Sequence, residues 1–275
     1  MTMTTWTNKK VWFVLVGVLA FGLLIDAAIA AYTVREYSCN TIVLDVKGDL
    51  VTSYATAGVS DDAMGYVTYS DWFAKTVELT EKSKTVKAII IDIDSYGGLP
   101  VAGEEIANAL KRTEKKNVAL IRTAGLSSAY WAASGADRII ASRNSDVGSI
   151  GVSLQLRNFV EKNKKEGIRV TSITSGQYKG IGDPNRELTD DEKKMLQEDV
   201  DKIHENFVSA ISENRGLPKE DVSKLATGES MLGEEALDGK LIDAIGDLAD
   251  AKAYLAKELG EEVRICMPPA AESGS

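Results

Sequence analysis

Three segments of the chain carry glycine, serine and lysine where these residues could hydrolyse an acyl bond. Gly97 and Gly98 stand between an apolar run and a helical pattern, so their backbone N–H groups could hold an oxyanion or simply form a turn. Ser127 follows a second apolar run, where serine is either a nucleophile or an ordinary helix N-cap. Lys179 lies among Tyr, Ile and Gly residues, where folding would either exclude water and make it a base or leave it exposed.

A serine nucleophile needs a partner that accepts its proton, and the usual partner is a histidine held by a carboxylate. The chain contains one histidine, His204. It falls within the pattern of a long helix, where it neighbours the apolar Ile203 but projects about 100° away from it, as a surface residue does. The sequence therefore favours a Ser127–Lys179 pair over a Ser-His-Asp triad.

From Asn40 onward, stretches rich in valine and isoleucine alternate with amphipathic stretches. Such alternation predicts an α/β fold in which helices flank a mostly parallel sheet. The three chemically interesting segments each follow a predicted strand, and the role of the loop-like segment Val51–Thr68 stays unassigned. The predicted strands are Thr41–Val46, Ala88–Ile93, Val118–Ile121, Arg138–Ala141 and Val170–Ile173, and the predicted helices are Trp72–Lys82, Val101–Arg112 and Leu188–Arg215.

The last of these helices carries its own boundary signals. Thr189 and Glu192 have the spacing of a capping box at its start. Gly216 and Pro218 follow its last turn and are expected to end it.

The amino-terminal segment Val11–Ala31 is mainly apolar. Its length of about 20 residues suits a helix that crosses a ~30 Å hydrocarbon layer. Lys9 and Lys10 precede it, so residues 1–10 are expected to stay in the cytoplasm as a tail and the rest to be exported. The alternative is a signal peptide cleaved after Ala30, because Ala28–Ala30 fits the small-x-small pattern. Either interpretation predicts a catalytic part outside the cytoplasm, and the anchored form is a single-pass protein of the cell membrane.

Composition limits the remaining options. The formal net charge of −9 argues against a nucleic-acid partner. Cys39 and Cys266 provide neither metal-ligand spacing nor a disulfide framework, so they read as structurally incidental, with a single long-range bridge between them left open. Serine chemistry of this kind needs neither a metal nor an organic cofactor.

From about Asn40 to Leu255, the order of these motifs resembles signal peptide peptidase A, a family of the Clp-protease/crotonase-like superfamily. Asp94–Gly98 is similar to the family's Asp-Ser-Pro-Gly-Gly, with tyrosine at position 96 in place of proline. Leu126–Trp131 is similar to Ala-Ser-(Gly/Ala)-(Gly/Ala)-Tyr-(Tyr/Trp), and Asp146–Val152 to Thr-Gly-Ser-(Ile/Leu)-Gly-Val. Tyr178-Lys179 with Gly182 and Pro184 resembles the segment of the base, and Thr227–Gly246 the closing motif.

The resemblance assigns roles to individual residues. It implies that Ser127 is the nucleophile, with Ser128 as a lesser alternative, and that Lys179 is the general base. Ser149 is expected to hydrogen-bond that lysine. Gly97 and Gly98 are expected to form the oxyanion hole, Gly98 being the better candidate. The peptidase domain is expected to span residues 40–260, followed by a tail over residues 261–275.

The resemblance implies a serine endopeptidase that degrades signal-peptide remnants and other apolar peptides at the outer face of the cytoplasmic membrane, as a homo-oligomer. One alternative is an inactive membrane scaffold of the same fold, because Tyr96, Ser128 and Val147 depart from the family motifs. A crotonase-type acyl-CoA enzyme is the other alternative, which an exported location without coenzyme A disfavours.

Overall fold

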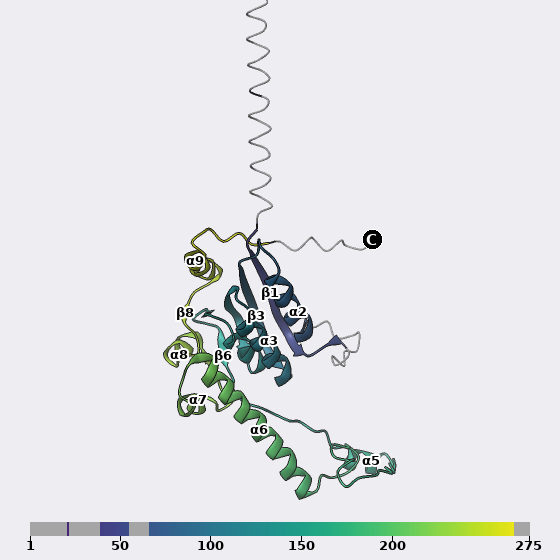
Figure 1. Ribbon diagram of the computed structural model, residues 1–275. Coiled ribbons are helices and arrows are strands. Elements are labelled where there is room, and N and C mark those ends of the chain that lie inside the picture. Colours follow the sequence, from purple (N-terminus) through teal and green to yellow (C-terminus); the bar gives the residue numbers. More distant parts are fainter. Residues whose placement is uncertain (1–20, 22–38, 55–65, 267–275) are drawn as a thin grey trace, which may run out of the picture.

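The computed structural model describes Phe21 and residues 39–54 and 66–266 (Figure 1). Apart from Phe21, the predicted membrane span Val11–Ala31 lies outside the described residues, as do the cleavage position after Ala30 and residues 55–65 of the unassigned loop. Among the residues that are described, no helix combines the length and the apolar character needed to cross a membrane.

The described residues form an eight-stranded sheet whose main path runs β2-β1-β3-β4-β5-β8, all parallel. β6 pairs in parallel with β4, and β7 pairs antiparallel with β6. This confirms the predicted α/β fold with a mostly parallel sheet. The strands are β1 Thr41–Val51, β2 Val67–Tyr69, β3 Ala88–Gly98, β4 Lys116–Leu126, β5 Ile139–Ala141, β6 Asp146–Gly148, β7 Ser230–Leu232 and β8 Ala244–Ile245.

Helices cover both faces of the sheet, which explains the near-continuous apolar runs of its central strands. Ile89, Ile91 and Ile93 of β3 pack with residues of α2, α3 and α4. The alternate residue Ile90 lies in a second cluster with Leu255 of α9. The helices are α2 Ser70–Glu81, α3 Pro100–Arg112, α4 Ser128–Ser134, α5 Val160–Lys165, α6 Asp190–Arg215, α7 Lys219–Leu225, α8 Gly233–Asp238 and α9 Leu248–Leu259.

The two ends of the described domain are joined to each other. A disulfide links Cys39 and Cys266 across a sequence separation of 227 residues, so the expectation that these cysteines are incidental is wrong. The backbone beside it pairs with β1, since Thr41 N–H donates to the Arg264 carbonyl at 3.1 Å. Val263 is buried in the second apolar cluster. The folded domain therefore continues to Cys266 instead of ending at residue 260.

Most predicted elements are present, including the capping box of Thr189 and Glu192 at the start of α6. Gly216 ends that helix in the left-handed conformation, as predicted. The strand predicted over Val170–Ile173 is wrong: this segment has no regular secondary structure, and Ile173 is 94% exposed. β-branched residues favour a strand only where a neighbouring strand pairs with them, and the described chain offers this segment none.

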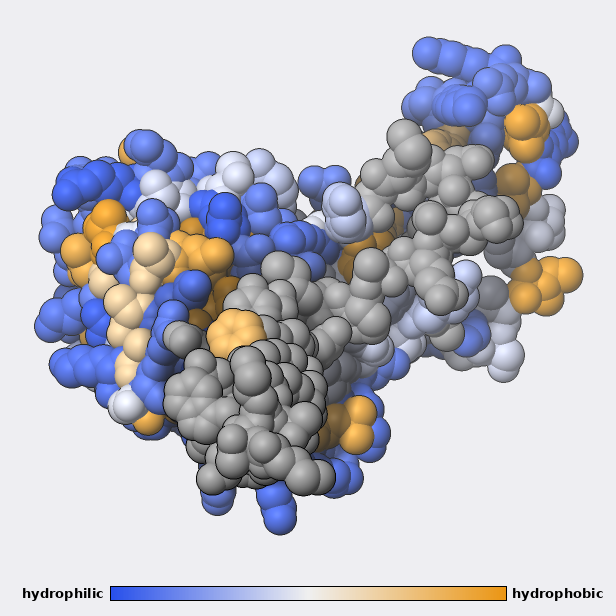
Figure 2. Space-filling model, turned by 90° about the horizontal axis from the view of Figure 1, so that it is seen from above, coloured by the Kyte–Doolittle hydropathy of each residue, from blue (hydrophilic) through white to orange (hydrophobic). Residues whose placement is uncertain are grey.

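We call residues 152–189 the arm. It leaves the sheet after β6, carries α5 and ends where α6 begins. Both α5 and the start of α6 lie well away from the sheet (Figure 1). Figure 2, with the arm at the right, shows apolar residues among hydrophilic ones on its surface. The exposed apolar side chains of the arm are Leu154, Leu156, Phe159, Ile168, Val170, Ile173 and Tyr178.

Candidate active site

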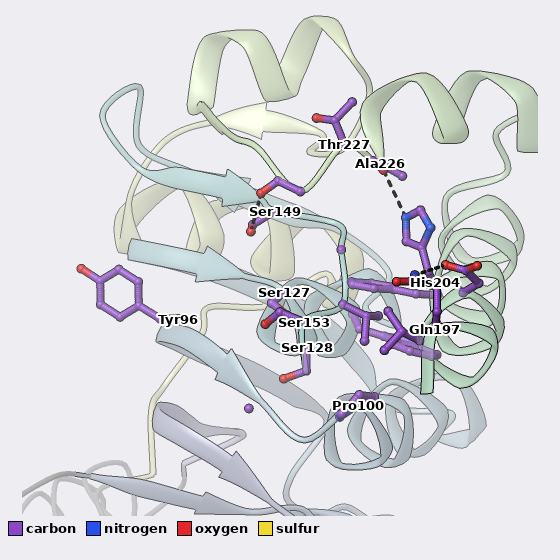
Figure 3. Close-up of a pocket in the computed structure, with 18 residues that line it drawn as sticks. Tyr96, Pro100, Ser127, Ser128, Ser149, Ser153, Gln197, His204, Ala226 and Thr227 are labelled. Atoms are coloured by element: carbon purple, nitrogen blue, oxygen red, sulfur yellow. Dashed lines mark hydrogen bonds between the residues drawn. The ribbon is translucent and has the colours of Figure 1, made fainter. Parts of the chain in front are cut away.

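A cleft of about 590 Å³ lies between α4, α6 and the loop Ala226–Glu229 (Figure 3). Three of its lining residues come from the carboxyl ends of adjacent parallel strands: Gly98 ends β3, Ser127 follows β4, and Ser149 follows β6. Parallel strands present their carboxyl ends at one edge of the sheet, which is where α/β proteins place ligand sites. The fold thus brings together three of the predicted site residues.

The backbone of Ser127 is held in a strained conformation, with φ 52° and ψ −127°. Residues other than glycine avoid positive φ, and such strain persists where surrounding contacts impose it, often at functional sites. Here Ser127 N–H donates to the Gly148 carbonyl at 2.8 Å, and Trp131 N–H donates to the Ser127 carbonyl at 3.0 Å. The Ser127 side chain makes no capping hydrogen bond to α4. The arrangement therefore fits a nucleophile better than an N-cap.

Gly97 lies against this serine, and neither Gly97 nor Gly98 accommodates a side chain. A Cβ on Gly97 would lie 2.8 Å from the Ser127 Cβ, and one on Gly98 would lie 2.2 Å from the Leu50 carbonyl oxygen. Gly97 N–H donates to Ser95 Oγ at 3.0 Å. Since that amide is already engaged and only Gly98 of the pair lines the cleft, Gly98 is the better oxyanion-hole candidate.

Ser149 is fixed by the loop Ala226–Glu229. Its backbone φ is 49°, its N–H donates to the Glu229 carbonyl at 3.0 Å, and its Oγ donates to the Gly228 carbonyl at 2.9 Å. Gly228 N–H in turn donates to the Ile150 carbonyl at 3.1 Å. With its proton committed, the Ser149 oxygen retains lone pairs that can accept a hydrogen bond from an amine.

Lys179 does not reach this cleft within one chain. It lies on the arm, is exposed, and its backbone N–H donates to the Gly176 carbonyl at 3.2 Å. It is not among the residues that line the cleft. Of the two outcomes that the sequence left open for Lys179, exclusion from water and exposure, the single chain shows exposure, because the arm does not fold back onto the sheet.

His204 belongs to this cleft, although its sequence pattern predicts a residue on the helix surface. The ring is half-buried, lines the cleft, and lies with Nε2 3.1 Å from the Ala226 carbonyl oxygen (Figure 3). One turn further along α6, the Phe207 ring stacks on Trp131 with centroids 4.7 Å apart. The spacing of His204 and Phe207, three residues apart on one helix face, was the available signal.

Ser128, the lesser candidate for the nucleophile, is only 2% exposed. Its Oγ has no hydrogen-bond partner among the described residues. Its main chain lies against α3, since a Cβ on Gly103 would lie 2.3 Å from the Ser128 carbonyl oxygen. A hydroxyl enclosed in this way is a poor nucleophile, so Ser127 is the better candidate.

The closing motif supports the helix that follows Ser127. Tyr130 of α4 is fully buried and donates its hydroxyl to the Leu241 carbonyl at 2.8 Å, and burial raises the pKa of this phenol. Asp243 accepts from Ile139 N–H at 2.7 Å and from the Arg215 guanidinium at 2.6 Å.

No group of three or more His, Cys, Asp or Glu side chains in the described residues could hold a metal ion.

Sequence comparison relates the chain to known proteins. Residues 109–262 match the model of Peptidase family S49. A protein of Methanocaldococcus jannaschii named as a protease is 33% identical over 87% of this chain and 73% of its own length. A protein of Enterococcus faecium named as signal peptide peptidase SppA is 28% identical over 68% of this chain and 55% of its own length.

The fold has a counterpart among solved structures. A ClpP1 variant from Listeria monocytogenes superposes with a TM-score of 0.50 at 15% identity, over 76% of this chain and 92% of that chain. This likeness places the chain among Clp-protease-like folds. The family match over residues 109–262 and the 33% identical relative establish that the chain belongs to Peptidase family S49, in which one relative is named as signal peptide peptidase SppA, and that it is a serine peptidase.

Proposed function

We propose that the protein is a membrane-anchored endopeptidase with a Ser-Lys dyad, which degrades signal-peptide remnants and other apolar peptides at the outer face of the cytoplasmic membrane. The observation that carries the proposal is the strained, uncapped Ser127, which lies in one cleft with Gly98 and Ser149. The shaped cleft and the enforced backbone strain favour an active enzyme over an inactive scaffold.

The proposed dyad needs Lys179 of a second copy. Lys179 stands on an arm whose apolar side chains are exposed, Ile173 at 94% and Val170 at 50%. Burying one such side chain contributes roughly 1.5–3 kcal/mol, so several of them favour association. The proposed homo-oligomer would cover the arm and carry its lysine to the Ser127 of a neighbour.

In the proposed reaction, neutral Lys179 accepts the proton of Ser127 and the resulting alkoxide attacks the peptide carbonyl carbon. Backbone N–H groups at the glycine turn, that of Gly98 first, stabilise the oxyanion. The lysine then passes its proton to the leaving amine, and an acyl-enzyme forms. Water, activated by the same lysine, releases the acid. Ser149 Oγ accepts a hydrogen bond from the lysine amine and so orients it.

Two features support the proposed location. The segment Val11–Ala31 has the length and composition of a membrane span preceded by lysines. The disulfide between Cys39 and Cys266 is typical of proteins outside the reducing cytosol. A peptidase held at the outer face would meet apolar peptides as they leave the bilayer.

The test mixes two inactive variants. Ser127→Ala and Lys179→Ala should each abolish cleavage of an internally quenched apolar peptide. When the two are co-expressed, random assembly should pair an intact serine with a neighbour's intact lysine at about a quarter of the sites, and activity should return to that level. An active Lys179→Ala enzyme would exclude the dyad, and an inactive mixture would exclude the exchange between copies.

A further inference from the structure

Helix α6 contacts both halves of the cleft within one turn. Phe207 stacks on Trp131 of α4, the helix that starts directly after Ser127, with ring planes 9° apart. His204 contacts the Ala226 carbonyl on the opposite wall (Figure 3). The helix therefore joins the part of the site that holds the nucleophile to the part that holds Ser149.

The hydrogen bond of His204 has a defined direction. A carbonyl oxygen can only accept a hydrogen bond. The ring nitrogen Nε2, 3.1 Å from the Ala226 oxygen, is therefore protonated and donates the hydrogen bond. In Figure 3 the ring is turned toward Ala226 and lies apart from Ser127. The imidazole thus hydrogen-bonds the loop and not Ser127, so the ring does not form a Ser-His pair.

The next residues of the same loop accept two hydrogen bonds from Ser149. The Gly228 carbonyl accepts from Ser149 Oγ at 2.9 Å and the Glu229 carbonyl from Ser149 N–H at 3.0 Å. The loop also approaches the strand end closely, since a Cβ on Gly151 would lie 3.0 Å from the Gly228 Cα. A displacement of the loop would therefore move the Ser149 hydroxyl.

We propose that His204 is a positioning residue of the active site, which acts through the loop Ala226–Glu229 to fix Ser149. This inference rests on the proposed function, because Ser149 is the group that would orient the incoming Lys179 amine beside Ser127. Effective acid–base catalysis requires the base within hydrogen-bond reach of the proton that it abstracts. A loop freed from α6 would lower the fraction of sites in which the amine is in place.

Substitutions of His204 that keep or remove the hydrogen-bond donor distinguish this positioning role from a role in packing alone. The terminal N–H of glutamine reaches as far along the side chain as Nε2 of histidine, whereas that of asparagine ends near Nδ1. Phenylalanine fills the space without a donor. Glutamine should thus keep the bond to Ala226, and the other two residues should lose it.

The experiment measures kcat and KM on an internally quenched apolar peptide for the full-length wild type and for His204→Gln, His204→Asn and His204→Phe. The Asn and Phe variants should lose about two- to tenfold in kcat, the range that one hydrogen bond spans, with KM within about twofold. The Gln variant should recover most of that loss. Ser209→Ala, which removes the bond of an exposed α6 hydroxyl to the Glu205 carbonyl outside the cleft, serves as the matched control and should leave kcat unchanged.

Several results would overturn the role of His204. A Phe variant as active as the wild type would show that the bond to Ala226 does not matter for turnover. A Gln variant as impaired as the Asn variant would show that the donor is not the relevant feature. A fall in thermal stability without any fall in kcat would reduce His204 to a structural residue. Absence of cleavage by the wild type itself would instead overturn the proposed function, and this role with it.

Discussion

Replacing Ser128 with alanine should stabilise the fold, even though this residue lies next to the candidate nucleophile Ser127. Its hydroxyl is enclosed and lacks a hydrogen-bond partner within the described residues. A buried polar group without a partner costs about 1–3 kcal/mol of unfolding free energy. Alanine fits the same space without that cost, so Ser128→Ala should gain roughly 1–2 kcal/mol.

The same helix provides the control. Ser134 is 1% exposed, and its Oγ donates to the Trp131 carbonyl at 2.6 Å and accepts from Asn214 Nδ2 at 2.9 Å. Ser134→Ala removes both bonds and leaves the Asn214 amide without its partner. This variant should lose about 1–3 kcal/mol. Two serine-to-alanine changes on one short helix should therefore act in opposite directions.

The assay is chemical denaturation in urea followed by circular dichroism, at one fixed protein concentration because association contributes to apparent stability. An unchanged slope with denaturant would attribute the shift to stability alone. In a thermal melt, each kcal/mol corresponds to about 2–4 °C for a domain of this size. A loss of stability in both variants would refute the reasoning, since it would mean that the Ser128 hydroxyl is satisfied in the folded protein.

Three further predictions concern other parts of the molecule. Closing a loop of 227 residues by the Cys39–Cys266 disulfide contributes about 5 kcal/mol in the chain-entropy estimate, so reduction should lower the melting temperature by roughly 10–20 °C in a calorimetric scan. Gly98→Ala should lower kcat about a hundredfold or more in the peptide assay, because its Cβ would meet the Leu50 carbonyl and displace an oxyanion donor. The Arg186 guanidinium, with Thr189 N–H, lowers the pKa of Glu192 from 4.5 to about 2. Since the folded pKa is the lower one, this contribution to stability is present above pH 4.5 and is lost as the pH falls toward 2; Arg186→Gln should move acid unfolding, measured by circular dichroism, to higher pH.

The parts of the site that the sequence identified are those built by local backbone chemistry. Gly98 ends a strand and Ser127 and Ser149 each follow one, and parallel strands bring such positions to one edge without any knowledge of side-chain packing. Lys179 could not be placed in this way. Its position depends on which surface the arm packs against, and the local sequence around Lys179 does not show that. The contact of His204 with Ala226 was equally inaccessible, because two elements that are distant in sequence create it.

The fold shows the same division. Long strands were predicted, but β1, β3 and β4 continue past their expected ends to Val51, Gly98 and Leu126. Their last residues include Asp, Lys and Gly, which have low strand propensity and are held there by pairing with neighbours. β6, β7 and β8 contain three residues or fewer, too few for a periodic signal. The strand expected at Val170–Ile173 has the propensity but no neighbour in the described chain.

For the proposed membrane-anchored enzyme, the length of β1 sets a distance between the bilayer and the site of cleavage. The strand begins at Thr41, two residues after the disulfide to which the proposed anchor leads, and nine residues later Leu50 pairs with Gly98 at the glycine turn. At ~3.3 Å per residue, these nine steps span about 30 Å. With Thr41 at the bilayer surface and the strand standing upright, the proposed enzyme would cleave that far above the lipid. A peptide still embedded at one end would have to expose about nine extended residues, so short stubs would escape the enzyme until they leave the membrane.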